Sequence, residues 1–325
     1  MFFQVAQKGK NGFWLYVATI ILVIVGAIIG QVPLGMVMVA SASANQVDQE
    51  TMDKVQETMD FSLLGIDPNL TLLLMLLTFI GALGMLWLGV SKIHDKPFLS
   101  VITARQELDW SRVFWAFGVW TALTVVLELV MYNMDPGNYS VQFDLSSFIP
   151  LLLIALFLLP FQTSFEEIMF RGYLLQGLGL LVKNRWFPLI VTSVIFGALH
   201  FFNPEVKKFG LGLMMVYYIS IGLFLAICTL MDDGLELALG IHAATNIYGA
   251  TIVSFSGSAL QTPTIFRMAS LDALLMLIAS LASAAIFLAV AARKYNWKNW
   301  DKLYAKIVVD SPPSNAITNE QMPNT

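Results

Sequence analysis

Six polar side chains suited to acid–base chemistry lie within strongly apolar stretches of this sequence. They are Glu166, Glu167, Arg171, His200, His242 and Asn246. An ionisable side chain at bilayer depth costs several kcal/mol, so by default it marks a functional site. Glu167 and Arg171 stand one helical turn apart, as do His242 and Asn246, so each pair projects from one face of a helix. These faces must meet in the folded chain, because an unpaired charge among apolar groups is too costly to keep.

Such a set of groups suits the attack of an activated water molecule on an amide carbonyl. A carboxylate in a low-dielectric site can act as a general base near neutral pH. Histidine can donate a hydrogen bond to a developing oxyanion or bind a metal ion, and an asparagine amide can donate to the same oxyanion. Packing alone would explain His200 or Asn246 taken singly. The whole set goes beyond packing and predicts a peptidase that works inside the membrane.

The signals of other hydrolase mechanisms are absent from the sequence. His200 is followed by Phe-Phe-Asn-Pro at 201–204, so it does not begin a His-Glu-x-x-His zinc helix. No Gly-x-Ser-x-Gly elbow occurs. The adjacent Asp232 and Asp233 are expected at a short turn between spans. Serine, aspartyl and conventional zincin mechanisms are therefore disfavoured.

The apolar stretches predict an all-α, polytopic integral membrane protein. Hydrophobic residues make up 57% of the 325 residues and charged residues 12%, and the mean hydropathy is +0.72. Eight stretches have the length of a membrane span. They cover roughly residues 13–40, 70–90, 112–131, 148–170, 187–203, 209–231, 235–255 and 270–292. The fourth can continue helically to about residue 182.

No long polar segment separates these stretches, so residues 1–308 are expected to form one membrane domain. The motif-bearing peptidase core covers about residues 148–255. Residues 309–325 are rich in Pro, Ser and Asn, and we expect them to be disordered.

The basic residues predict that both termini lie in the cytoplasm. We take the first span as an uncleaved anchor, because its apolar run is too long for a signal peptide. With an even number of spans, the inner segments then carry 13 Lys and Arg residues and the outer segments four, leaving Arg171 aside. The inner residues are Lys8, Lys10, Lys92, Lys96, Arg105, Arg112, Lys183, Arg185, Arg293, Lys294, Lys298, Lys302 and Lys306. The outer residues are Lys54, Lys207, Lys208 and Arg267.

The polar groups resemble the three signature motifs of the CAAX prenyl protease and bacteriocin-processing (CPBP) family. This family is also called Abi and includes the type II CAAX prenyl endopeptidases. The motifs are Glu166-Glu167-x-x-x-Arg171, Phe196-x-x-x-His200 and His242-x-x-x-Asn246, in the order that the family shows. The resemblance implies an eight-helix membrane peptidase with a cavity open toward the cytoplasm. The likeness to bacterial members implies the inner (plasma) membrane of a bacterium.

Motif positions imply a role for each residue. Glu166 would activate the water, and Glu167 would support it and pair with Arg171. His242 and Asn246 would bind the oxyanion.

The metal requirement is left open by the sequence. The resemblance makes His200 a further member of the polar cluster, and the family is commonly labelled a metalloprotease. One divalent metal such as zinc could be held by His200, His242 and a carboxylate of Glu166 or Glu167. The two carboxylates diverge by about 100° around a helix, so one cannot easily be the base while the other is a ligand. We therefore favour a glutamate-activated water with no cofactor.

The expected partners are the lipid bilayer and a membrane-associated or lipidated protein or peptide, prenylated or not. No nucleic-acid partner is expected, and the sequence does not fix the oligomeric state. The alternative is a non-catalytic membrane protein, either a transporter or an immunity protein that sequesters a toxin. In that case the intramembrane charges would line a path or a binding surface. The sequence has neither an internal repeat nor paired Gly/Pro-broken spans, and their absence speaks against a transporter.

Overall fold

A computed structural model of the chain describes residues 2–308, and the predicted disordered tail at 309–325 lies outside the described residues. The α-helices are α1 (Phe2–Ala6), α2 (Phe13–Ala44), α3 (Gln49–Thr58), α4 (Pro68–Leu88), α5 (Trp110–Met134), α6 (Leu145–Phe157), α7 (Leu159–Glu167), α8 (Leu175–Val182), α9 (Trp186–Leu199), α10 (Pro204–Phe209), α11 (Leu211–Asp232), α12 (Glu236–Thr251) and α13 (Ala273–Lys294). The strands are β1 (Tyr139–Val141), β2 (Val253–Phe255) and β3 (Phe266–Met268). Two π-helical segments, η2 (Gly89–Ile93) and η5 (Ile168–Leu174), extend α4 and join α7 to α8.

Each of the eight predicted spans coincides with a helix, and the predicted all-α polytopic membrane fold is confirmed. Within residues 2–308, six helical stretches are long and apolar enough to cross a membrane. They are Phe13–Ala44, Pro68–Ile93, Trp110–Met134, Leu145–Val182, Leu211–Asp232 and Ala273–Lys294. The other two helices, α9 and α12, have 14 and 16 residues. At about 1.5 Å per residue they cover less than the ~30 Å hydrocarbon core. These two short helices carry the second and third motifs.

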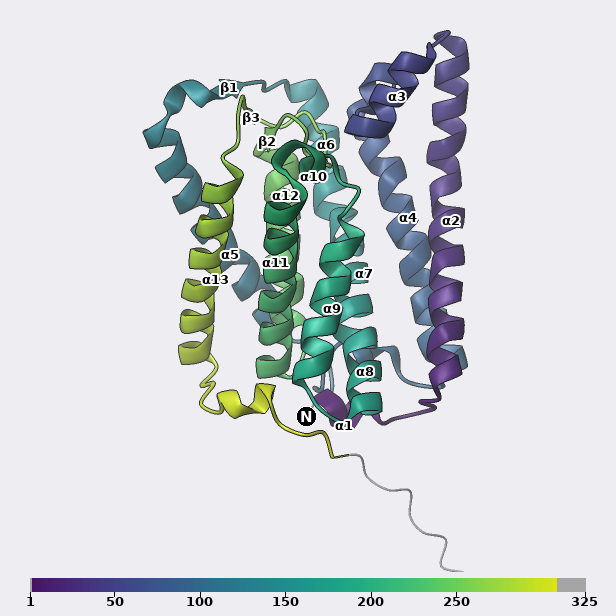
Figure 1. Cartoon of the computed structure of the whole chain (residues 1–325), viewed down its shortest axis with the longest axis vertical. Coiled ribbons are helices and arrows are strands. Elements are labelled where there is room, and N and C mark those ends of the chain that lie inside the picture. The colour runs from purple at the N-terminus through teal and green to yellow at the C-terminus, as the bar shows by residue number, and fades with distance from the viewer. Residues whose placement is uncertain (1, 309–325) are drawn as a thin grey trace, which may run out of the picture.

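The pair α2 and α4 stands at one side of the molecule (Figure 1). Gly26 and Gly30, one helical turn apart on α2, place its backbone directly against the α4 backbone at Gly81 and Leu77. Helices in a membrane associate by such close packing, since lipid removes the hydrophobic drive between them. A larger side chain at either glycine would meet backbone atoms and push the helices apart. The α4 helix in turn contacts α7, which carries the two glutamates.

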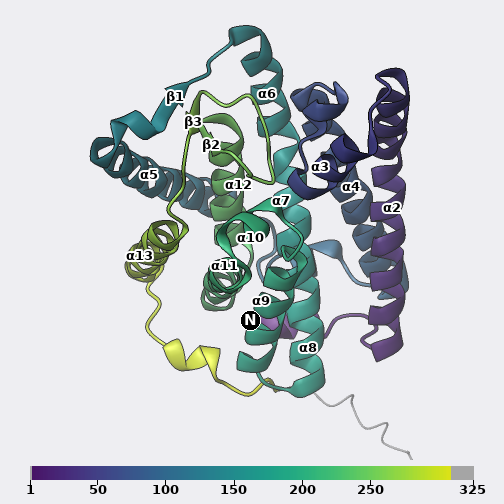
Figure 2. The same ribbon diagram turned by 45° about the horizontal axis from the view of Figure 1, so that its top comes forward.

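The α12 helix runs through the middle of the helices and contacts α5, α6, α7 and α11 (Figure 2). Gly240 lets α12 approach the α5 backbone at Val113. On the other side, Trp120, Phe224 and Phe287 pack together as a buried aromatic cluster between α5, α11 and α13. The third motif is therefore held on a helix that is fixed from several directions.

A small sheet lies at the end of the bundle away from α1 (Figure 1). Its strand order is β1-β3-β2, with β1 antiparallel and β2 parallel to β3. The same end holds a cavity of about 240 Å³ between the start of α4 and the loop before β3. None of the six predicted site residues lines this cavity.

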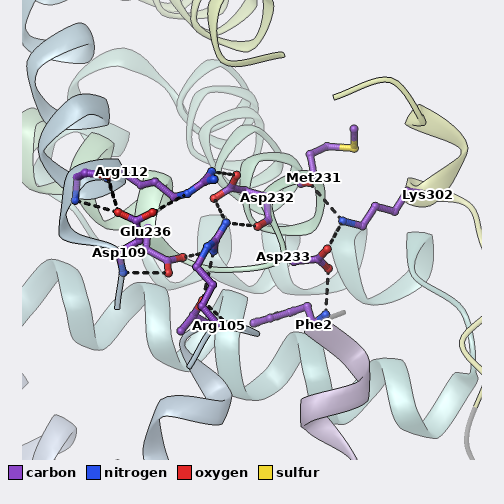
Figure 3. Close-up of polar contacts among 11 residues, drawn as sticks. Phe2, Arg105, Asp109, Arg112, Met231, Asp232, Asp233, Glu236 and Lys302 are labelled. Carbon is purple, nitrogen blue, oxygen red and sulfur yellow. Dashed lines mark hydrogen bonds and ion pairs between the residues drawn. The ribbon is translucent and has the colours of Figure 1, made fainter. Parts of the chain in front are cut away.

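A network of ion pairs lies at the opposite end, where the α11–α12 turn meets the start of α5 (Figure 3). We call Arg105, Asp109, Arg112, Asp232 and Glu236 the edge network. Arg105 donates to Asp232 Oδ2 at 3.1 Å and to Glu236 Oε2 at 3.0 Å. Arg112 donates to Asp232 Oδ1 and, through Nε, to Asp109 Oδ2 at 3.0 Å. The backbone N–H of Asp109 lies 3.5 Å from Glu236 Oε1. Asp232 and Glu236 are the two buried carboxylates of this network, and both oxygens of each have partners.

The neighbouring Asp233 joins the two ends of the described chain (Figure 3). The backbone N–H of Phe2 donates to Asp233 Oδ1 at 2.9 Å, and Lys302 Nζ donates to Asp233 Oδ2 at 2.7 Å. Both ends therefore lie on one side of the bundle, as an even number of crossings requires.

Candidate active site

The two glutamates lie where one long helical stretch changes its winding. The α6 helix ends at Phe157, and α7 begins at Leu159 with Pro160 in its first turn. Proline suits that position, because the first-turn N–H groups have no partner within a helix. After Glu167 the helix widens into the π-helical segment η5 before α8 resumes. Such segments are frequent at functional sites, because they redirect side chains without breaking the helix.

Glu167 is the hub of a buried ionic group. Its Oε1 accepts from Arg171 Nη1 at 3.0 Å and lies 2.7 Å from His242 Nδ1. Glu167 and Arg171 are each 0% exposed. The predicted pairing of these two residues along one helix face is therefore present, and His242 of α12 joins it.

The guanidinium of Arg171 is enclosed by two further groups. Its Cζ lies 4.1 Å from the centre of the Phe196 ring of α9. Its Nη2 donates to the carbonyl of Gly222 on α11 at 3.4 Å. Burying a single charge would be very costly, whereas a paired and hydrogen-bonded one can be kept. Glu167 and Arg171 therefore form a nearly neutral unit that ties α7, η5, α9 and α11 together.

Glu166 reaches the same imidazole from the other side. Its Oε1 accepts from Gln162 Nε2 at 2.7 Å, and its Oε2 lies 3.6 Å from His242 Nε2. Among residues 2–308, Oε2 has no hydrogen-bond partner, although Glu166 is only 9% exposed. Although the two glutamates diverge around the helix, both lie next to His242: Glu166 faces its Nε2 and Glu167 faces its Nδ1.

The amide of Gln162 links Glu166 to the third motif. Gln162 Oε1 accepts from Asn246 Nδ2 at 2.8 Å, while its Nε2 donates to Glu166. We call Gln162, Glu166, Glu167, Arg171, His242 and Asn246 the site cluster. The sequence analysis missed Gln162. The signal was available, since Gln162 precedes Glu166 by one helical turn in an apolar stretch.

His200 lies beside the site cluster and contacts it through aromatic rings. At the end of α9, its Nδ1 lies 2.7 Å from the carbonyl of Phe196. Its ring stacks on Tyr218 of α11 with centroids 4.3 Å apart. The Phe196 ring lies 4.7 Å from His200 and 6.2 Å from His242, so it stands next to both imidazoles. Tyr218 is a second neighbour that the motifs did not reveal.

Comparison with known proteins gives two matches that agree with this arrangement. The model of the Rce1-like type II CAAX prenyl endopeptidases matches residues 146–248, the stretch from α6 to α12. The Bacillus subtilis (strain 168) "Uncharacterized protein YyaK" is 31% identical over 242 residues, which are 74% of this chain and 78% of that protein. No solved structure matches the chain.

The chain belongs to the Rce1-like CAAX endopeptidase (CPBP) family. The resemblance drawn from the three motifs is therefore confirmed. The matched residues include all six predicted site positions and nearly coincide with the expected motif region. Membership of a protease family, together with the long apolar helices, makes the chain an integral membrane protein of an intramembrane peptidase family.

The donor groups of this CPBP site do not converge as a metal centre. Within residues 2–308, no group of three or more His, Cys, Asp or Glu side chains is placed to hold one metal ion. His242 Nδ1 is bonded to Glu167, and His200 Nδ1 faces a carbonyl of its own helix. Only their Nε2 atoms and the glutamate carboxylates remain as possible ligands, and these are not grouped to hold one ion, so no step below is assigned to a metal.

Proposed function

We propose that this CPBP protein is an intramembrane endopeptidase that cleaves a membrane-associated or lipidated peptide with a water molecule activated by Glu166. One observation carries the proposal. Glu166 has one carboxylate oxygen fixed by Gln162 and the other without a partner beside His242 Nε2. A general base needs such an oxygen, held in place yet free to take a proton.

The cleavage proceeds in two steps. In the first, Glu166 Oε2 takes a proton from water while the water oxygen bonds to the carbonyl carbon of the scissile amide. The negative charge that develops on the carbonyl oxygen accepts hydrogen bonds from Asn246 and from His242 Nε2–H. In the second, the carbon–nitrogen bond breaks and the proton on Glu166 moves to the departing nitrogen. The products are a carboxylic acid and an amine, which exchange a proton to become a carboxylate and an ammonium, and Glu166 is again ionised.

The other residues prepare His242 for this role. The carboxylate of Glu167 accepts from His242 Nδ1 and stabilises the imidazolium that can donate from Nε2. Arg171 offsets the charge of Glu167, so the pair adds little net charge to the membrane interior. The hydrogen-bond donors of His242 and Asn246 are thus held in place before the reaction begins. Donors that need no reorganisation are usually the largest source of oxyanion stabilisation in enzymes.

We further propose that both termini lie in the cytoplasm. The uneven distribution of basic residues supports this orientation. The contact of Phe2 and Lys302 with the same aspartate is consistent with it, since the proposal needs both described ends on one side of the bundle. The side from which a substrate enters would follow from this orientation.

The test compares the wild type with Glu166→Gln in two assays. In the first, the purified proteins meet quenched-fluorescent peptides that carry a farnesylated cysteine near the C-terminus, and the same peptides without the lipid. In the second, the protein termini in membranes of cells carrying either form are compared by mass spectrometry. Cleavage products or new termini that occur only with the wild type support the proposal. Identical results from two folded, expressed proteins would refute hydrolysis and favour a binding role.

A further inference from the structure

Gln162 occupies a position that the three motifs do not assign. We propose that it is a positioning residue, one that sets which oxygen of Glu166 meets the water and which way the amide of Asn246 faces. The inference rests on the proposed function and adds a residue to it. The observation behind it is that both ends of the Gln162 amide are bonded to site residues, one on its own helix and one on α12.

The bond to Glu166 divides the work between the two carboxylate oxygens. Gln162 Nε2 donates to Oε1, which leaves Oε2 as the oxygen beside His242 Nε2. Without this donor the carboxylate could turn about its last bond, because no other partner holds Oε1 among the described residues. Glu166 would then meet the water in more than one orientation. A general base is effective only when it lies within hydrogen-bond reach of the proton it removes.

The bond to Asn246 fixes the second group. An asparagine amide has two N–H donors, and one of them is taken by Gln162 Oε1. The carbonyl oxygen of Gln162 therefore determines which edge of Asn246 carries its donors into the site. Replacing Gln162 by an apolar residue would free this amide to turn over, so that its oxygen could face the oxyanion. An acceptor in that place would repel the negative charge that the site must bind.

A residue that only packs α7 against α12 would behave differently. Loss of packing lowers stability and the amount of folded protein. The size of that loss would be the same whether or not Asn246 is present. Loss of positioning lowers kcat, leaves KM nearly unchanged and is smaller once Asn246 is already missing, because only the bond to Glu166 then remains to be lost. Non-additivity between two contacting residues is the sign of a shared interaction. The two roles can therefore be separated by a double-mutant cycle.

The chain offers a matched control in Gln176, on α8 of the same helical stretch. Gln176 is buried, whereas Gln162 is partly buried, and the Nε2 of Gln176 donates to the backbone carbonyl of Ser100 at 2.8 Å, away from the site. Gln176→Met thus removes the same functional group from the same span without touching a site residue. Its kcat should stay within about 3-fold of the wild type, whatever it does to stability.

The experiment measures kcat and KM for the wild type, Gln162→Met, Asn246→Leu, the double variant and Gln176→Met. The probe is the farnesylated peptide or a membrane-anchored peptide found by the comparison of termini, and thermal unfolding confirms that each protein is folded. We expect Gln162→Met to lower kcat about 10- to 100-fold with KM within about 3-fold. In the Asn246→Leu background the further loss should be clearly smaller than in the wild type, because Gln162 then positions Glu166 alone.

Two results would overturn the assignment alone. One is a pair of losses that multiply in the double variant, and the other is a Gln162→Met enzyme that resembles Gln176→Met. In both cases the wild type still cleaves and Glu166→Gln does not, so the proposed function stands. If the wild type cleaves no faster than Glu166→Gln, the proposed function fails and the role of Gln162 fails with it.

Discussion

The site cluster and the edge network both bring carboxylates together with arginine, but they differ in how completely they are bonded. In the edge network, both oxygens of Asp232 and both oxygens of Glu236 have partners. In the site cluster, one oxygen of Glu166 and one of Glu167 are buried without any partner among the described residues. Native proteins rarely leave such groups unpaired, and each exception calls for an explanation.

The two regions also differ in their surroundings. Arg105 and Arg112 of the edge network keep roughly a quarter and a fifth of their side-chain surface in contact with solvent, whereas Arg171 has none. Water can therefore take over part of a broken bond in the edge network but not in the site cluster. The comparison indicates that the edge network serves to hold α11, α12 and the start of α5 together. The site cluster gives up some stability for the chemistry of its unpaired oxygens.

The largest effect that would test this difference is on activity. Glu166→Gln should reduce cleavage by roughly 10²–10⁴-fold, because it removes the proposed base while keeping the shape of the side chain. Its melting temperature should change little, because the oxygen that is lost has no partner to lose. Cleavage of the lipidated peptide and thermal unfolding in detergent provide the two measurements.

The matched control for that change is Glu128→Gln. Glu128 also lies in a span, on α5, and accepts from the hydroxyl of Tyr139 at 2.6 Å. It should keep nearly full activity. A Glu166→Gln protein that remains active, or one that unfolds well below the control, would remove the distinction between the two regions.

Arg171→Met should show the next largest effect, on stability. It leaves Glu167 charged, buried and without its nearest cation, which costs about 3–5 kcal/mol when one partner of a buried pair is removed. Denaturant or thermal unfolding of the purified protein measures the loss. Arg171→Met with Glu167→Gln should recover much of it, since no uncompensated charge then remains. If the double variant is no more stable than Arg171→Met, the pair is not acting as the neutral unit described above.

The sequence predicted part of this arrangement, and local spacing explains which part. All eight apolar stretches are helical, and six of them are long enough to cross a membrane, because apolar stretches of that length have few alternatives. The bond between Glu167 and Arg171 followed from their separation by one helical turn. The position of His242 between two carboxylates did not follow, because it depends on how far α12 slides along α7. That register is set by contacts such as Gly240 against the α5 backbone, which no spacing within one helix encodes.

His200 is a second residue whose position the sequence predicted only in part. Its motif placed it with the other polar residues, and it does lie near them, next to the Phe196 ring that also adjoins His242. However, its Nδ1 faces the carbonyl one turn back, at the point where α9 ends. A helix terminus leaves such carbonyls without partners, and a histidine there can satisfy one. The sequence identified the group, but the end of the helix decided where its ring points.

Glu236→Gln should have a smaller effect, and it should lower stability instead of activity. It weakens one ion pair of the edge network, and Arg105 is exposed enough for water to replace part of the bond, so we expect a loss of about 1–3 kcal/mol in unfolding free energy. Activity per folded molecule should stay within about 3-fold. Glu107→Gln is the control, because Glu107 lies exposed in the same segment before α5. A large loss of kcat in Glu236→Gln would mean that the edge network positions His242 directly.

The smallest effect concerns a third kind of buried polar group, one that is fully bonded while neutral. His94 is fully buried, with Nδ1 at 2.7 Å from the carbonyl of Lys10 and Nε2 at 2.8 Å from the hydroxyl of Tyr173. Burial lowers the pKa of His94 below its ordinary value of 6.5. The unfolded chain therefore binds a proton at a pH where the folded chain does not. The contribution of His94 to stability is complete above pH 6.5 and is lost as the pH falls below that value.

Thermal unfolding of the wild type and His94→Gln between about pH 5 and 8 tests this last point. The wild type should exceed the variant most at the upper end, and the difference should shrink on acidification. A difference that stays constant with pH would show that His94 takes up a proton in the folded chain as easily as in water. Full hydrogen bonding would then not be enough to keep a buried group neutral. The contrast between complete and incomplete bonding would lose its power to separate structural groups from reactive ones.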